Sequence, residues 1–136
     1  MSYITVYPIL DLEASPTNQE VFDNAASFIL GQGPCITSDV TPRYKYRSGG
    51  KACAMGAFMT DYEAAVADEE GWGASSVVSK ATRFSQYGEL FSHLVIAHDL
   101  AADCDPIDFQ AKFRDEMRRV AEVFSLDASK LEEANI

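Results

Sequence analysis

The sequence has few residues of the kinds that build metal sites or disulfide frameworks. Its three cysteines, Cys35, Cys53 and Cys104, show no CxxC spacing, and its two histidines, His93 and His98, complete neither an HExxH nor a zinc-finger pattern. We therefore expect no metal site and no cofactor. Unpaired cysteines in odd number also favour a reducing, intracellular compartment over a secreted, disulfide-linked protein.

Long apolar runs and a targeting segment are also missing. No stretch is apolar over the length needed to span a membrane. The N-terminus, MSYITVYPILDLEAS, lacks the basic start and the long apolar run of a signal peptide. These absences predict a cytoplasmic protein with no membrane partner.

Positive charge is scarce and unevenly placed. The chain has 11 basic residues against 21 acidic ones, a net charge of −10, and residues 1–42 contain no lysine or arginine. A protein that binds the nucleic-acid backbone takes its affinity mainly from positive charge, so we expect no direct contact with nucleic acid. The acidity suits a basic partner protein, such as one that itself binds nucleic acid. It is equally compatible with a simple role in solubility.

The residues that are present suffice for one folded domain, 1–136. Hydrophobic residues make up 47% of the chain, and a chain of this length buries a core without disulfides or metals. Apolar residues at helical spacing predict long helices at about 18–30, 86–102 and 106–125. We expect these helices to pack together, with the following side chains inside: Phe22, Ile29, Leu94, Phe113, Met117 and Phe124.

Shorter helices and a small sheet complete the predicted fold. A Thr60–Glu63 capping box predicts a helix at about 61–69, and further short helices are expected at about 75–83 and around Leu131. Residues 3–10 are β-prone, with Pro8 restricting them to an edge strand. RYKYR and KACAM flank Ser48-Gly49-Gly50, which is typical of a hairpin turn. The fold class is therefore α+β: helix-dominated, with a two- to three-stranded antiparallel sheet.

The predicted hairpin concentrates positive charge at Arg43, Lys45, Arg47 and Lys51. Beside a glycine-rich turn, such side chains could hold a phosphate or a carboxylate. One hypothesis is therefore a small anion- or nucleotide-binding protein. The segment SGGK is not a Walker loop, because Ala52 stands where serine or threonine is required. The alternative interpretation is a solvent-facing strand whose charges protect an edge from pairing.

A second hypothesis is a thiol hydrolase built from Cys53, His98 and Asp99. Their order in the chain suits a nucleophile, a base and an orienting acid. Against it, KACAMG matches no local signature of such enzymes, and a histidine centred on an apolar helical stripe is more often a core residue. We therefore expect His98 to be buried and hydrogen-bonded and His93 to be exposed.

An acidic run followed by a tryptophan is the candidate partner-binding surface. Asp68, Glu69 and Glu70 are consecutive, so they fan around a helix end and do not converge on a metal. Trp72 lies between two glycines in a predicted turn. A tryptophan in such a turn either folds back onto the core or anchors a partner contact.

Four runs of the sequence resemble small proteins encoded in bacteriophage genomes and prophages: NQEVFDNAASFIL, YRSGGKACAMGAFMTDYEAAVADEEGW, VIAHDLA and VAEVFSLD. The shared features are a helix starting near NQEVFD, Tyr-Arg followed by KCAhG with h apolar, an acidic stretch ending Glu-Gly, and a His-Asp pair. This chain differs in having Met59-Thr60 where a proline usually opens the acidic helix, and in its long stretch 75–86.

The resemblance covers residues 18–127 loosely and makes residues 1–15 an N-terminal extension. It implies origin and fold rather than a mechanism. The positions that it marks are Tyr46, Arg47, Cys53, Gly56, Tyr62, Glu70, Gly71, His98 and Asp99.

The acidity and the resemblance together give the leading hypothesis. It is a non-enzymatic phage protein in the cytoplasm of a bacterial host, which binds and inhibits or modulates a host protein. A partner that handles nucleic acid or serves in defence would present the basic surface that such acidity fits. A homodimer is compatible with the sequence.

Overall fold

The computed structural model describes residues 6–35, 46–48, 50–80 and 82–133. Its α-helices are α1 (Asn18–Gln32), α2 (Asp61–Glu70), α3 (Ala74–Lys80), α4 (Thr82–Ser85), α5 (Gly88–Ala102), α6 (Phe109–Phe124) and α7 (Lys130–Glu133). The remaining elements are the 3₁₀ turns η1 (Leu12–Ala14), η2 (Gly56–Phe58) and η3 (Pro106–Asp108), and the strands β1 (Arg47–Ser48) and β2 (Lys51–Ala52). The predicted helix-dominated α+β fold is confirmed.

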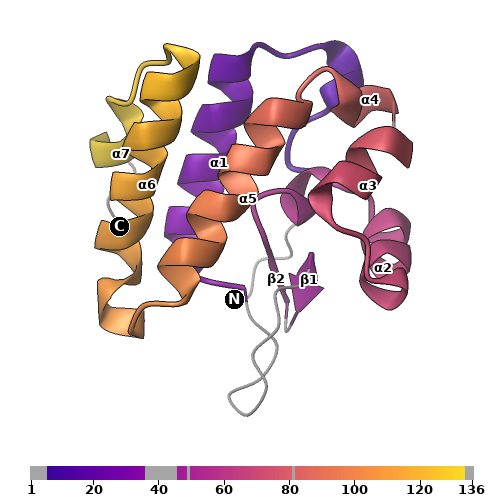
Figure 1. Ribbon diagram of the computed structural model, residues 1–136, viewed down its shortest axis with the longest axis horizontal. Coiled ribbons are helices and arrows are strands. Elements are labelled where there is room, and N and C mark those ends of the chain that lie inside the picture. The colour runs from indigo at the N-terminus through magenta and orange to yellow at the C-terminus, as the bar shows by residue number, and fades with distance from the viewer. Residues whose placement is uncertain (1–5, 36–45, 49, 81, 134–136) are drawn as a thin grey trace.

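The helices form two groups with the hairpin between them (Figure 1). Helix α5 packs along α6, α1 contacts both, and α7 packs on α1. Helices α2, α3 and α4 gather at the opposite end of the molecule, and β1 and β2 lie below the junction in this view. α5 belongs to both groups, because it also packs against α3. The hairpin is therefore placed where it can contact both the long helices and α2.

The core lies where the apolar stripes of the long helices meet. Of the six side chains predicted to be inside, Phe22, Ile29, Leu94, Phe113 and Met117 are fully buried. The sixth, Phe124, is only half-buried and packs against the core from its edge. It lies at the last position of α6, and its ring meets the edge of the exposed His93 ring at 5.3 Å between centroids.

Capping explains where the predicted helices begin and end. Both α1 and α2 start with a complete capping box, formed by Thr17 with Glu20 and by Thr60 with Glu63. In each box the threonine hydroxyl accepts a hydrogen bond from the backbone N–H of the glutamate, and the glutamate carboxylate accepts one from the backbone N–H of the threonine. Helix α1 continues to Gln32, two residues beyond the prediction. It stops at Gly33, whose φ of +90° suits glycine.

The helices expected at 75–83 and 106–125 are both found, with differences in their limits. All described residues between 75 and 83 are helical, in α3 and α4, and residue 81 lies outside the described ranges. The helix expected at 106–125 begins as η3 and becomes α-helical only at Phe109. Pro106 opens η3 at its first turn, where a missing N–H costs nothing. Local periodicity does not distinguish 3₁₀ from α-helical turns over three residues.

The strand predicted at 3–10 is wrong over residues 6–10, which form no strand; residues 3–5 lie outside the described ranges. Ile9 N–H donates instead to Ala57 O of η2, at 2.9 Å. Among the described residues the sheet therefore has only two strands, antiparallel, with Arg47 opposite Ala52 and Ser48 opposite Lys51. Ser48 belongs to β1 and not to the turn, as its pairing with Lys51 requires.

Candidate functional site

Arg47 is the centre of a contact network between the hairpin, η2 and α2. Its Nε donates to Gly56 O at 3.1 Å and its Nη2 to Met59 O at 2.6 Å. Its Nη1 donates to Asp61 Oδ1 at 2.5 Å. The guanidinium carbon also lies 3.6 Å from the centre of the Tyr7 ring, a cation–π contact. The Arg47 side chain therefore holds the fold together and does not simply face solvent.

Asp68 has a structural role at the start of the hairpin. Its Oδ1 accepts from Tyr46 N at 2.8 Å and its Oδ2 from Arg47 N at 3.1 Å. A carboxylate that bonds two backbone amides is fixed in place. Of the predicted partner-binding acids, Asp68 is therefore the one whose carboxylate is already occupied within the chain.

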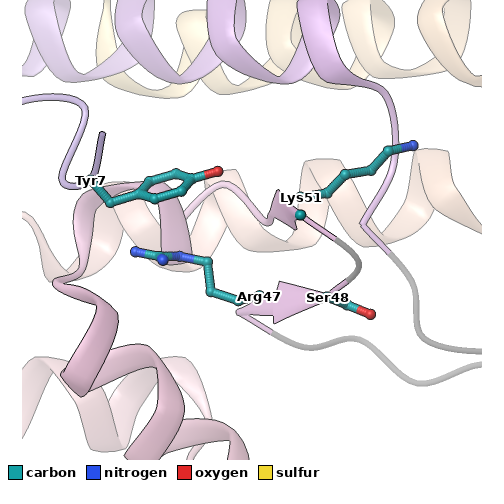
Figure 2. A pocket seen from close by; sticks show the side chains of 5 residues that line it. Tyr7, Arg47, Ser48 and Lys51 are labelled. Carbon is teal, nitrogen blue, oxygen red and sulfur yellow. The ribbon is translucent and has the colours of Figure 1, made fainter. Parts of the chain in front are cut away.

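Of the other three cations predicted to bind an anion, the structure describes only Lys51. Lys51 is exposed on β2 and lines a pocket with Arg47, Ser48, Gly50 and Tyr7 (Figure 2). Arg43 and Lys45 lie outside the described residues. The structure therefore brings two of the four predicted cations to one pocket.

The buried His98 has both ring nitrogens engaged, and His93 is exposed, so both histidine predictions are confirmed. Cys35 N–H donates to His98 Nε2 at 3.0 Å, and His98 Nδ1 lies 2.9 Å from Asp99 Oδ1. Because Nε2 accepts, the ring proton is on Nδ1 and is donated to the carboxylate. The Cys35–His98 bond ties α5 to the segment that leaves α1, and Asp99 fixes the orientation of the His98 ring.

Cys53 has the surroundings of an unreactive thiol. Gly56 N–H donates to its Sγ at 3.2 Å. Burial, opposed by the amides of Gly56 and Met55 and reinforced by Cys35 and Asp99, raises the pKa of the Cys53 thiol to about 12. No hydrogen bond joins Cys53 to His98 within the described part of the chain. Because thiol nucleophiles react as thiolates, this geometry supplies neither the nucleophile nor the base contact that the hydrolase hypothesis needs.

Position 56 requires glycine because its backbone lies directly against the backbone of the hairpin. A Cβ at this position would lie 2.1 Å from Tyr46 O, a backbone atom that cannot move aside. At this position Gly56 O accepts from Arg47 Nε, and Gly56 N–H donates locally to Cys53 Sγ, three residues earlier. Tyr46, Arg47, Cys53 and Gly56, which the resemblance marked, thus belong to one packing unit.

Helix α2 is anchored on its inner side at both ends. At its start, the Glu63 carboxylate is bound by the Arg83 guanidinium, with Arg83 Nη1 2.7 Å from Oε2 and a second bond from Nη2 to Oε1. Burial alone would raise the pKa of the Glu63 carboxyl, but the hydrogen bonds from Arg83 and Thr60 hold it below its usual range. Near the end of the helix, Asp68 bonds the hairpin amides.

The outer face of α2 carries both an exposed aromatic ring and exposed acids. Tyr62 is 79% exposed. The Asp61 side chain is 84% exposed despite its bond to Arg47, and Glu69 and Glu70 are exposed. Tyr62 and Glu69 are seven positions apart, two helical turns, and so lie on one side of the helix. Figure 1 shows α2 at the edge of the molecule opposite α6 and α7.

Trp72 folds back onto the core rather than standing free. Its ring is half-buried against the core, and Lys80 Nζ lies over it at 5.0 Å from the ring centre. Tyr46 Oη donates to the Trp72 carbonyl at 2.7 Å, which fixes the turn after α2.

The sequence pattern did not predict Tyr62 as a surface residue; only the resemblance marked this position. One exposed ring on a short helix leaves no periodic signal.

Comparisons with protein-family models, with curated proteins and with solved structures find no match to this chain. In the described part of the chain, no helix has the length and apolar character needed to cross a membrane. Among the same residues, no three His, Cys, Asp or Glu side chains are grouped so as to hold a metal ion.

Proposed function

We propose that this chain is a non-enzymatic, phage-derived binding protein that docks on a basic surface of a bacterial host protein and inhibits or modulates it. The exposed face of α2, formed by Asp61, Tyr62, Glu69 and Glu70, is the contact surface. A partner that handles nucleic acid or serves in defence fits best, because such proteins present the basic surfaces that acids of this kind attract. The site of action is the host cytoplasm.

The observation that carries the proposal is the exposure of Tyr62 on a firmly held helix beside Glu69 and Glu70, two exposed acids that form no ion pair with any described residue. Tyrosine is enriched at protein interfaces, since its ring buries a large area at a low entropic cost. The neighbouring acids attract a basic surface from a distance and set its orientation. The anchoring through Glu63 and Asp68 keeps the helix in place, so little ordering is needed on binding.

The two other hypotheses have less support. Arg47 donates hydrogen bonds to Gly56, Met59 and Asp61, so the hairpin has a structural role as well, and anion binding alone does not explain its basic residues. The buried Cys53 thiol and the occupied ring of His98 weaken the case for a thiol hydrolase.

The test is capture of host proteins from bacterial lysate on the immobilised protein, followed by mass spectrometry. The test variant is Tyr62→Ala/Glu69→Gln/Glu70→Gln. The matched control is Ile107→Ala/Glu89→Gln/Glu122→Gln, which removes one exposed apolar side chain and two exposed acids elsewhere. Thermal melts first establish that both variants remain folded.

We expect wild type and control to retain the same basic host protein, and the α2 variant to retain about tenfold less, a loss of about 1.4 kcal/mol. Retention should fall with added salt, because exposed charges are screened. Equal retention by the α2 variant and the control would exclude α2 as the contact surface. Loss of the effect on the host protein in Cys53→Ser, with the fold intact, would favour the thiol-hydrolase hypothesis instead.

A further inference from the structure

Beside the hairpin lies a pocket of about 250 Å³ lined by Tyr7, Arg47, Ser48, Gly50 and Lys51 (Figure 2). Two of these lining residues are cations and none is acidic. In a chain with a net charge of −10, this is a local reversal of sign. The volume is several times the roughly 30 Å³ that a water molecule occupies in the liquid, so a small oxyanion fits.

Arg47 presents a fixed cation to this pocket. Three acceptors hold its guanidinium, and the Tyr7 ring stacks on it at 3.6 Å. A guanidinium carries five N–H donors, so two remain that no described residue uses. Asp61 offsets part of the charge, but its carboxylate is 84% exposed and does not line the pocket. A cation already held in place costs little entropy when it binds a ligand.

Lys51 provides a second cation, and a movable one. Its side chain is exposed, and its ammonium has no hydrogen-bonding or ion-pairing partner among the described residues. Figure 2 shows the Arg47 guanidinium beneath the Tyr7 ring, whereas the Lys51 side chain extends away from Arg47, beyond the Tyr7 hydroxyl. The long flexible stem of a lysine lets its ammonium swing toward a bound anion.

Two further features complete the pocket. Ser48 lies opposite Lys51 in the hairpin and lines the pocket. Its hydroxyl points away from Arg47 in Figure 2, and a change of side-chain rotamer is needed for it to donate to a ligand. Gly50, with φ +80°, has open space where a Cβ would stand, so the turn leaves room for a ligand. Burial and the charge of Asp68 raise the pKa of the nearby Cys35 thiol to about 11, and the Ser48 amide and the charges of Lys51 and Arg47 oppose that rise.

We propose that this pocket binds a phosphoryl group, with Arg47 as the fixed cation, Lys51 as the movable cation and Ser48 as a hydroxyl donor. The site is separate from the outer face of α2 and does not depend on the function proposed for that face. Its ligand is either free phosphate or the terminal phosphate of an ester, since both offer the same oxygens to these donors.

The experiment is an NMR titration of the whole chain with sodium phosphate, compared with sodium chloride at matched ionic strength. We expect saturable shifts of the Ser48, Gly50 and Lys51 amides with phosphate only. Lys51→Gln should weaken binding about tenfold or more. Lys130→Gln, which removes an equal charge from α7, should leave binding unchanged. Equal shifts with chloride, or wild-type binding by Lys51→Gln, would overturn the proposal.

Two nucleoside probes identify the source of the phosphoryl group. Tighter binding of adenosine monophosphate than of phosphate, with no binding of adenosine, assigns a phosphate ester. Equal binding of phosphate and the monophosphate assigns the free anion. Binding of adenosine as strong as that of the monophosphate would show that the phosphoryl group is not what the pocket recognises, and would also overturn the proposal.

Discussion

The side-chain amide of Gln32 pairs with the backbone of Ala52 as a neighbouring strand would. Gln32 Oε1 accepts from Ala52 N at 3.0 Å, and Gln32 Nε2 donates to Ala52 O. Ala52 is fully buried and belongs to β2, which has no third strand beside it in the described structure. The last turn of α1 thus satisfies the backbone groups that a two-stranded sheet leaves unpaired.

Replacing Gln32 should therefore destabilise the fold. In Gln32→Ala, a buried N–H and a buried C=O lose their partners, which costs about 1–3 kcal/mol. The matched control is Gln19→Ala at the start of the same helix. Gln19 bonds Asp127 N and O at 2.8 Å each, but at an exposed place where water replaces the lost bonds. Urea denaturation should show a loss below about 1 kcal/mol for the control; equal losses would refute the role of Gln32.

Replacing Phe113 with alanine should destabilise the fold more than replacing Phe124, which lies on the same helix, α6. Its ring is fully buried and stacks on Phe109 at 5.8 Å between centroids, whereas Phe124 is half-buried. Phe113→Ala should lower the free energy of unfolding by about 3–5 kcal/mol, the usual loss for a buried aromatic side chain. Phe124→Ala should cost clearly less in the same denaturant titration. A Phe113→Ala loss below about 1 kcal/mol, the range of surface changes, would place that ring outside the core.

The Glu63–Arg83 pair should make stability depend on pH in the acid range. The folded-state pKa of Glu63 lies below its ordinary value of 4.5. The stabilisation is therefore complete above that ordinary value and is lost as pH falls through the lower, folded-state pKa. Glu63→Gln keeps a residue that suits the capping box but removes the charge. Urea midpoints measured from neutral to acid pH should fall less steeply in the variant; parallel curves would contradict this assignment.

The three thiols should differ in reactivity. Cys35 and Cys53 are buried, with pKa values raised to about 11 and about 12, whereas Cys104 is partly exposed. A disulfide reagent at about pH 8, near the ordinary thiol pKa of about 8.5, should modify Cys104 first. The other two should react only after urea is added. Rapid modification of native Cys53 would show an accessible thiolate and would revive the hydrolase hypothesis.

Local patterns in the sequence were sufficient to predict where the long helices lie and which of the two histidines is buried. The Thr60–Glu63 capping box acts over three residues, and the apolar stripe of α5 is a property of one helix, so both can be read without knowing the fold. The stripe placed His98 on the buried face and His93 on the exposed one, as the structure has them. The limits of these elements depended on short 3₁₀ turns, which periodicity does not resolve.

The role of the basic hairpin was decided only by tertiary structure. Alternation along the strand placed Arg47 among charged residues, but its partners are Tyr7 from the N-terminal segment and acceptors in η2 and α2. Asp68 likewise looks like one of three equivalent acids until the hairpin amides reach it. Helix caps and stripes arise from neighbours along the chain. Whether a charge serves the fold or a ligand depends on which distant groups lie within hydrogen-bonding distance, and only the packed chain determines that.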